Sequence, residues 1–509
     1  MRANLSDKKM VGRSAAGWVV VFLVFAIFLA LAALPVYLIP FHVSRNYNEG
    51  WNAYHALAAM SGGILYPPSD SFISNNYPPL SFYLVGAFGQ ITGDYVVAGR
   101  LISLTSLLIV ACNIFLLCRW IGADRMLASF GSALFLLAFC ELSPDYVATD
   151  DPQLLGHAFI TAGAVVFLNA ARRHGTNARV VVSVLLICAG GLVKHNLVAL
   201  PLALGTWVAI HDRRQFVRFL LAGLVVGVLA LGALYALWGQ AIVDGVLRYP
   251  RLLSWSTGVE LSWVLRLFLP YIAFCSAGCV ALPQQREIHF VIAYAIWSAL
   301  FGFPLLFGTG VNVNVLDDFT IALIIGTVAF AMAVEKGVIR LPFGLSHSRF
   351  VVVVMLAMPL FAKAALVTKR LVPEYESLLR NAKDWSALAD DLSRTDGPVA
   401  CDLLAICYWA GKSWEIDFFS YGQKLFVGIV TDKAFRERIG NSYFAYIFLQ
   451  GTRPSNRGLP NEVTAWTPKP YLPIETTAWL LSYYAPVRII GDDRLLAPSS
   501  VQKPDSDYK

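Results

Sequence analysis

The sequence predicts an all-α polytopic membrane bundle of about eleven helices, followed by a small α/β domain. Hydrophobic residues make up 57% of the 509 residues and charged residues only 14%, whereas soluble domains carry roughly 25% charged residues. Apolar runs long enough to cross a bilayer recur up to residue 368, and a spanning helix needs about 20 such residues. After this point charge and turn formers become frequent. We therefore expect a transmembrane domain over 1–368 and an outer domain over 369–509.

The expected spans follow the apolar runs in order: 17–40, 95–118, 126–142, 152–171, 180–193, 195–211, 217–238, 262–282, 289–307, 318–335 and 350–368. The first run resembles a signal peptide because it has a basic start and small residues near Ala30. Its apolar stretch continues to Ile39, longer than a signal sequence usually has, so we expect a retained span.

The runs 180–193 and 195–211 are short, and the alternative is one merged helix. That helix would hold Lys194 at its middle, where a charge is costly in a bilayer. We therefore expect two short helices that meet at Lys194 and His195 near one membrane face.

The placement of Lys and Arg predicts the orientation. With the N-terminus in the cytoplasm, the cytoplasmic segments before residue 369 hold sixteen of these residues, and the outer loops hold four, namely Arg45, Lys194, Arg248 and Arg251. Cytoplasmic loops of membrane proteins are enriched in this way. We expect a multi-pass protein of the plasma (inner) membrane whose C-terminal domain is periplasmic or extracellular. The net charge of +7 is spread over separate loops, which argues against a nucleic-acid partner.

The longest outer loop of the membrane part is 42–94, and we expect two helices lying in the membrane interface there, at 51–62 and 80–91. In the outer domain we expect an amphipathic helix at 374–394 and strands at 399–401, 446–448 and 487–490. The tail from Ala497 is expected to be disordered. Of the eight cysteines, Cys401 and Cys407 lie where a disulfide is allowed, and whether they pair is left open.

This topology places several acids and cations on the outer side. Such groups at a membrane edge usually face a site or a partner. Acids can accept a proton or hold a cation, and cations can hold a phosphate. Each residue also has a structural alternative: a solvated loop acid for Glu49, a helix cap for Asp150 and Asp151, a lipid headgroup contact for Arg100, a polar hinge for Lys194 and His195, and a turn for Asn314.

Short motifs then resemble the GT-C superfamily of polyprenyl-phosphate-sugar glycosyltransferases, which includes protein O-mannosyltransferases and lipid A aminoarabinose transferases. The motifs are NYNEGWNAYHA and YPPL in the first outer loop, AGRLISL in the next span, ATDDPQLLGHA, GGLVKHN and GVNVNVLDD. They cover most of the membrane region, but each is loose.

The resemblance implies roles for individual residues. The first-loop acid, here Glu49, corresponds to the proposed catalytic base, although the family often has Asp at this position. The second-loop acid corresponds to Asp150 or Asp151, which would position the acceptor or hold a divalent cation such as Mg²⁺ or Mn²⁺. Arg100 and Lys194 correspond to contacts with the lipid phosphate, and Arg248 is added to them. Further site candidates are Tyr77, His195, Arg251 and Asn314.

The leading hypothesis is an inverting hexosyl- or pentosyltransferase. It would move a sugar from a polyprenyl phosphate to a hydroxyl of a lipid or cell-envelope glycan on the outer face, among membrane lipids. One alternative is a transporter or flippase for a lipid-linked sugar, which predicts inverted repeats and broken helices near the bilayer midplane. Another is a scaffold or receptor whose outer domain binds a partner, which leaves the one-sided acids and bases unexplained.

Overall fold

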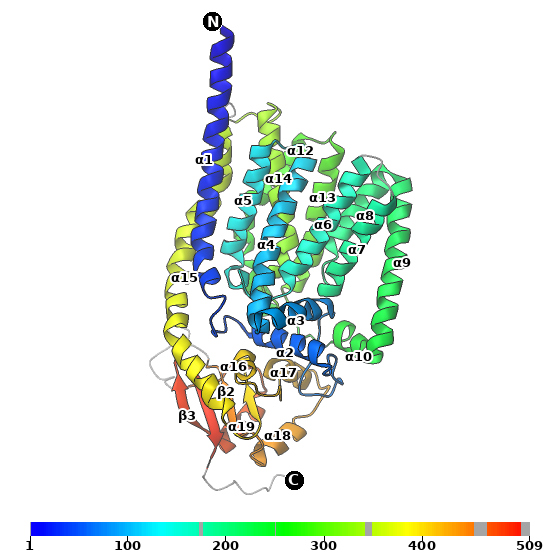
Figure 1. The fold of residues 1–509 in the computed structure, drawn as a ribbon. Coiled ribbons are helices and arrows are strands. Elements are labelled where there is room, and N and C mark those ends of the chain that lie inside the picture. Colours follow the sequence, from blue (N-terminus) through cyan, green and yellow to red (C-terminus); the bar gives the residue numbers. More distant parts are fainter. Residues whose placement is uncertain (1, 173–176, 250, 342–348, 452–465, 500–509) are drawn as a thin grey trace.

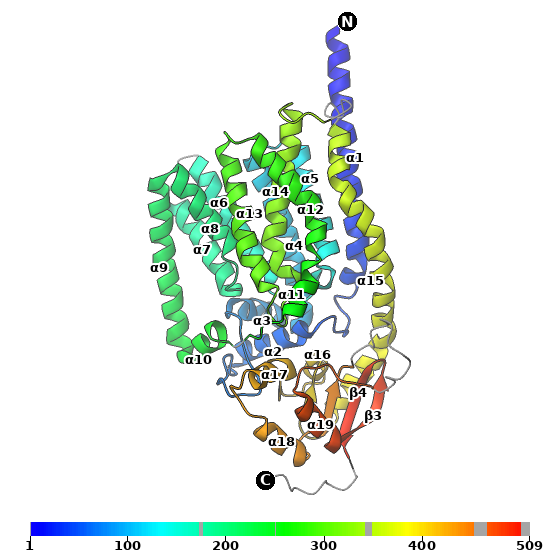
Figure 2. The same cartoon turned by 180° about the vertical axis from the view of Figure 1, so that it is seen from behind.

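The computed structural model describes residues 2–172, 177–249, 251–341, 349–451 and 466–499. A helical bundle occupies one end of the molecule, and a small mixed domain lies at the other (Figures 1 and 2). The long helices of the bundle are α1 (Arg2–Tyr37), α4 (Tyr95–Trp120), α5 (Arg125–Leu142), α6 (Gln153–Arg172), α7 (Asn177–Val193), α8 (Ala199–His211), α9 (Arg213–Trp238), α12 (Leu265–Ala281), α13 (Arg286–Leu305), α14 (Asp317–Glu335) and α15 (Arg349–Ser393).

Each of the eleven expected spans therefore contains a helix. Among the described residues, eight helices are long and apolar enough to cross a membrane, and α12 with the preceding α11 (Trp255–Ser262) gives a ninth, bent by 53°. The helices α7 and α8 are shorter, and residues 194–198 separate them. The prediction of two short helices meeting at Lys194 is confirmed.

The segment 42–94, which is expected to be the first outer loop, forms two helices, α2 (Tyr47–Ser61) and α3 (Leu80–Thr92), at the end of the bundle that faces the C-terminal domain (Figure 1). The helix α2 begins four residues earlier than expected, because Asn46 caps it by accepting a hydrogen bond from the Asn48 amide. Gly62 ends it in the left-handed conformation, at φ +74°, which glycine adopts without steric cost. The predicted helices are confirmed, with the first one extended.

The short connections at this end of the bundle also carry turns of helix. They are η1 (Pro144–Tyr146) between α5 and α6, α10 (Gln240–Ile242) with η2 (Val243–Leu247) after α9, and η3 (Val313–Leu316) before α14. Figure 2 shows α2 and α3 between the bundle and the C-terminal domain.

The C-terminal domain contains a four-stranded sheet in the order β1-β2-β4-β3, with β1 parallel to β2 and the other pairs antiparallel. The strands are β1 (Val399–Cys401), β2 (Tyr446–Leu449), β3 (Tyr484–Ile490) and β4 (Asp493–Pro498), and the helices are α16 (Leu404–Trp409), α17 (Phe418–Phe426), α18 (Lys433–Gly440) and α19 (Ile474–Tyr483). The three predicted strands are present. The fourth strand ends at Pro498, so the expectation of disorder from Ala497 is wrong at its first two residues. The rest of that prediction falls on residues 500–509, which lie outside the described part.

The predicted domain boundary at residue 369 falls inside a continuous helix. The helix α15 runs over 45 residues and contains both Pro359 and Pro373. It lies beside α1 in the bundle and continues into the C-terminal domain, where it packs against the sheet (Figures 1 and 2). A composition change therefore marks where the helix leaves the bundle, while the helix itself continues.

The C-terminal domain is held tightly against the first outer loop. A side chain at Gly50 would clash with the backbone of Ala405, since an ideal Cβ lies 2.0 Å from its nitrogen. The His42 and Trp409 rings stack at 4.8 Å, and the Tyr47 hydroxyl donates to the Asp417 carboxylate. Cys401 and Cys407 form a disulfide within this domain. The domain is thus positioned to shape any site that opens at this end of the bundle.

Candidate active site

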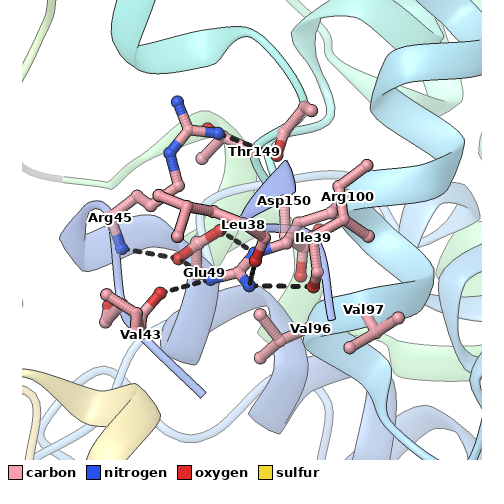
Figure 3. A network of polar contacts seen from close by, with 12 residues as sticks. Leu38, Ile39, Val43, Arg45, Glu49, Val96, Val97, Arg100, Thr149 and Asp150 are labelled. Carbon is pink, nitrogen blue, oxygen red and sulfur yellow. Dashed lines mark hydrogen bonds and ion pairs between the residues drawn. The ribbon is translucent and has the colours of Figure 1, made fainter. Parts of the chain in front are cut away.

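Glu49 and Arg100 form a fully buried ion pair between α2 and α4 (Figure 3). The Arg100 Nε donates to Glu49 Oε1 at 2.7 Å, and Nη2 donates to Oε2 at 2.8 Å. The remaining donors of Arg100 bind the backbone carbonyls of Leu38, Ile39, Phe41 and Val43. Neither side chain is left free for a substrate. The structure therefore places Glu49 and Arg100 in the packing between α2 and the bundle, and neither of them lines the polar cavity described below.

Asp150 belongs to the same cluster. Its carboxylate packs so closely on Gly99 that an ideal Cβ there would lie 2.0 Å from Oδ1. Burial raises the pKa of Asp150 well above its usual value, and the nearby charges of Glu49 and Asp151 add to this. Asp150 is thus packed against the buried pair of Glu49 and Arg100.

Asp151 lies on the other side of the same loop and is positioned by Arg45. The Arg45 guanidinium donates to the carbonyls of Pro144, Val147 and Ala148, at 3.4, 2.5 and 3.0 Å. Ala148 has a positive φ of 51°, which is strained for a residue with a Cβ and is often found at functional sites. The loop is thus fixed in one conformation that presents Asp151.

A polar cavity of about 230 Å³ opens beside Asp151. The Asp151 Oδ2 accepts a hydrogen bond from the Asn48 side chain at 3.0 Å, and Oδ1 lies 3.8 Å from the Lys194 ammonium. Lys194 also lies over the Tyr77 ring, 5.0 Å from its centre. Burial lowers the pKa of Lys194, but the attraction of Asp151 and Tyr77 outweighs this and places the pKa above its ordinary value. A carboxylate and a fixed positive charge therefore face one cavity.

The other predicted site residues divide into two groups. Tyr77, His195, Arg251 and Asn314 all line the polar cavity. Burial, together with Lys194 and Arg251, lowers the pKa of His195 to about 4, so this imidazole is neutral at physiological pH. Arg248 lies outside the cavity, with an exposed side chain that pairs with Asp244 at 3.2 Å. The expected place of Arg248 is thus corrected, and Arg251 holds the position facing the cavity.

An apolar groove of about 490 Å³ adjoins the polar cavity. It lies between α7 and α9 and above η2, and the two spaces share His195, Val246 and Leu247 as lining residues. Gly191 and Gly227 also line it, and a Cβ added to either would meet no atom within 4 Å. A long hydrocarbon chain fits such a groove, with a polar head in the cavity beside Lys194.

A chain of buried polar side chains supports Asp151 from inside the bundle. The backbone N–H of Gln153 donates to Asp151 Oδ1 at 2.8 Å. The side-chain Nε2 of Gln153 lies 2.9 Å from His157 Nε2. His157 in turn lies 3.7 Å from the Asp318 carboxylate, which accepts a 2.5 Å hydrogen bond from the Tyr294 hydroxyl. These contacts connect α6, α13 and α14 behind the cavity.

The residues predicted to hold a divalent cation do not fit that role. Asp150 is turned toward Glu49 and Arg100, whereas Asp151 is turned toward Asn48 and Lys194. Within the described ranges, no three His, Cys, Asp or Glu side chains are grouped so that they could hold a metal ion. We derive no step through a metal.

Sequence reasoning missed Asn48, whose side chain faces the cavity one residue before the predicted base. The sequence does contain a pattern that indicates the direction of the Glu49 side chain. Asn46-x-x-Glu49 resembles the capping box, in which an acid at the third helical position turns back to a backbone N–H at the helix start. Glu49 Oε2 accepts from the Arg45 amide at 2.8 Å. This pattern predicts a structural glutamate, and the helical turn then places Asn48 on another face.

No protein-family model matches the sequence, and no curated protein matches it. The structure is similar to the crystal structure of ArnT from Cupriavidus metallidurans in the apo state, with a TM-score of 0.59 and 14% identity over 95% of this chain and 98% of that one. The same protein bound to undecaprenyl phosphate gives a TM-score of 0.58, 14% identity and coverage of 96% and 100%.

The Archaeoglobus fulgidus oligosaccharyltransferase tethered to an acceptor peptide gives a TM-score of 0.50 and 10% identity, over 84% of this chain and 69% of that one. The chain therefore shares the fold of these proteins, which is the expected helical membrane bundle with a small mixed C-terminal domain, and it is a multi-pass membrane protein.

Proposed function

We propose that this protein is a membrane glycosyltransferase that moves a sugar from a polyprenyl phosphate to an acceptor hydroxyl. The observation that carries the proposal is the continuity of two spaces: a polar cavity with Asp151 and Lys194, and an apolar groove between α7 and α9. A donor with an anionic head and a hydrocarbon tail matches this pair. The similarity to a structure that contains undecaprenyl phosphate supports the same donor class.

In the proposed reaction Asp151 is the general base, in place of the Glu49 expected from the sequence. It accepts the proton of the acceptor hydroxyl as the oxygen forms a bond to the anomeric carbon. The bond between this carbon and the phosphate oxygen breaks, and its electron pair leaves with the polyprenyl phosphate. Attack from the side opposite the phosphate inverts the anomeric centre. General-base help of this kind contributes about 10²–10⁴ in rate.

Lys194 and Arg251 stabilise the phosphate as it leaves. Lys194 is buried and carries a positive charge, and electrostatic stabilisation by a fixed charge is strongest where water is excluded. The Asn48 side chain keeps the Asp151 carboxylate oriented toward the cavity. In the free protein the Lys194 ammonium lies 3.8 Å from the Asp151 carboxylate, and a bound phosphate would compete for the same ammonium.

We also propose that the site faces outward. The N-terminus of α1 lies at the opposite end of the bundle from α2, α3 and the C-terminal domain (Figure 1). A basic N-terminal segment stays in the cytoplasm in most membrane proteins, and the Cys401–Cys407 disulfide suits an oxidising compartment. The plasma (inner) membrane with an outward C-terminal domain satisfies both.

The test is a transfer assay with the purified protein, a panel of polyprenyl-phosphate sugars and cell-envelope acceptors, analysed by mass spectrometry. The proposal expects polyprenyl phosphate and a glycosylated acceptor in equal amounts. It also expects loss of both with Asp151→Asn, in protein that still binds donor. Movement of intact donor across a vesicle membrane without release of polyprenyl phosphate would favour the flippase alternative instead.

A further inference from the structure

A wide cleft of about 510 Å³ opens between the membrane bundle and the C-terminal domain. Aromatic rings from five segments line it, namely Tyr47, Trp51, Tyr77, Tyr146, Phe419 and Tyr471. We call this space the aromatic cleft. The rings are close together: the centres of Tyr47 and Phe419 are 5.7 Å apart, and those of Phe419 and Tyr471 are 5.6 Å apart.

The aromatic cleft continues into the polar cavity. Asn48, Tyr77, Tyr146, Arg251 and Asn312 line both spaces. A molecule lying in the cleft therefore ends beside Asp151 and Lys194, on a different side from the apolar groove, whose lining residues are absent from the cleft. Donor and acceptor can thus reach Asp151 along separate routes.

The side chains that line the aromatic cleft indicate the class of ligand that it can bind. Four asparagines, at 46, 48, 76 and 312, line the cleft, and a side-chain amide can both donate and accept hydrogen bonds. The charges are balanced, since Arg45 and Arg251 face Asp145 and Glu374, and Arg45 is already bound to loop carbonyls and to the Tyr375 hydroxyl. A sugar ring has C–H bonds on its faces and hydroxyls at its edge, so it packs on aromatic rings while its edge binds amides.

Such a lining does not suit a lipid tail, which needs an apolar wall, and its balanced charge does not select a charged peptide. The apolar groove shows the contrast, because its lining consists of aliphatic side chains and glycine, with Pro78, Cys188, His195 and Tyr235 as the exceptions.

The C-terminal domain supplies one wall of the cleft, and this wall is held in place. The Phe419 ring covers Gly310, where an ideal Cβ would lie 2.3 Å from the ring. Asp417 accepts hydrogen bonds from the Tyr47 hydroxyl and from the Ser420 amide. Lys424 on the same helix donates to the Ser71 carbonyl at 2.7 Å. Rings that are fixed before binding lose little entropy when a ligand packs on them.

We propose that the aromatic cleft binds a neutral glycan as the acceptor, and that Phe419 and Tyr471 of the C-terminal domain select it. This inference rests on the proposed function and deepens it, because it chooses a glycan acceptor over a lipid one. The acceptor hydroxyl at the end of the glycan reaches Asp151, and the preceding sugar units lie along the rings.

Binding without turnover tests this inference separately from the reaction. Neutral oligosaccharides built from glucose, galactose, mannose or arabinose are added to the purified protein, and saturation-transfer NMR detects which of them contact it. At least one is expected to bind to the wild type, and Phe419→Ala and Tyr471→Ala should each weaken it at least tenfold. Phe426→Ala, at an exposed position of α17, is the matched control and should leave binding unchanged.

Polyprenyl phosphate binding is measured on the same variants and should not change, which shows that the site is folded. If an oligosaccharide binds but no donor is consumed, the result supports the glycan inference and contradicts the proposed reaction. Failure of every neutral oligosaccharide to bind, or competition at the Tyr471-dependent site only by a lipid or by a peptide, would overturn the inference while leaving the donor site intact.

Discussion

The Arg100 guanidinium and the Glu49 carboxylate are joined by two hydrogen bonds, of 2.7 and 2.8 Å, and both side chains are fully buried. Removal of one partner from a buried ion pair leaves an uncompensated charge and costs about 3–5 kcal/mol. We therefore expect Glu49→Gln to lower the thermal stability of the purified protein severely, as measured by unfolding in detergent. Glu376→Gln, whose exposed side chain pairs with Arg380 at 3.7 Å, should have little effect.

A double substitution separates a structural pair from a catalytic one. If Glu49 and Arg100 act only on the fold, the combination Glu49→Gln with Arg100→Gln should be less destabilised than the sum of the single variants, and it should retain transfer where it folds. A well-folded Glu49→Gln protein without transfer would contradict this account and restore Glu49 as the base.

Asp151 should be required for the chemical step. Asp151→Asn keeps the side-chain shape but cannot accept a proton, so we expect turnover to fall by about 10²–10⁴. Because Asn also lacks the charge that pairs with Lys194, donor binding should be retained or become tighter. Steady-state kinetics and donor binding on the same preparation measure both quantities. A fall in donor affinity with unchanged turnover would assign Asp151 to binding instead.

The two arginines after α9 should differ in effect. Arg251 lines the polar cavity, whereas Arg248 is exposed and paired with Asp244. Arg251→Ala should raise the donor KM at least tenfold, and Arg248→Ala should leave it near the wild-type value. The comparison is direct because both residues are arginines, only three positions apart. Equal effects of the two variants would mean that the chain after η2 is placed differently around the donor.

Asp402 should make the stability of the protein depend on pH. Burial raises its pKa to about 7, whereas an unfolded aspartate titrates near 4. The folded state thus holds a proton that the unfolded state has released, so stability falls as pH rises from about 4 to about 7 and is level above that, by at most ~4 kcal/mol.

Thermal unfolding of the full chain at several pH values measures this effect. Asp402→Asn should remove the decline, while Asp396→Asn, at an exposed position of the same domain, should preserve it. A decline of the same size in the Asp402→Asn protein would show that another group is responsible.

Much of this architecture follows from local sequence signals. Apolar runs identify the spans because the bilayer fixes their length. The cost of placing the Lys194 charge in the middle of a span correctly predicts that α7 and α8 are separate helices. The strands β1 and β2 are short apolar segments between turns, and their predicted ranges agree with the structure to within one residue. These features depend on neighbouring residues only, and a single sequence contains that information.

The site was only partly predictable, because it depends on the direction in which each side chain points. The sequence correctly brings Asp151, Lys194 and Tyr77 to one end of the bundle, where they line the same cavity, but a turn of helix decides whether Asn48 or Glu49 faces that cavity. Arg248 and Arg251 are likewise three residues apart, and only the fold separates surface from cavity. The aromatic cleft combines residues from 47 to 471, so no local pattern could indicate it.

The most direct test of the central claim is the affinity of plain polyprenyl phosphate, which needs no knowledge of the sugar. We expect the purified wild-type protein to bind it, Lys194→Met to weaken binding strongly, and Gly227→Leu to weaken it by filling the apolar groove. Gly232→Leu, at an exposed position of α9 outside the groove, should bind as the wild type does. Equal affinity in all four proteins would contradict the placement of the donor and, with it, the proposed function.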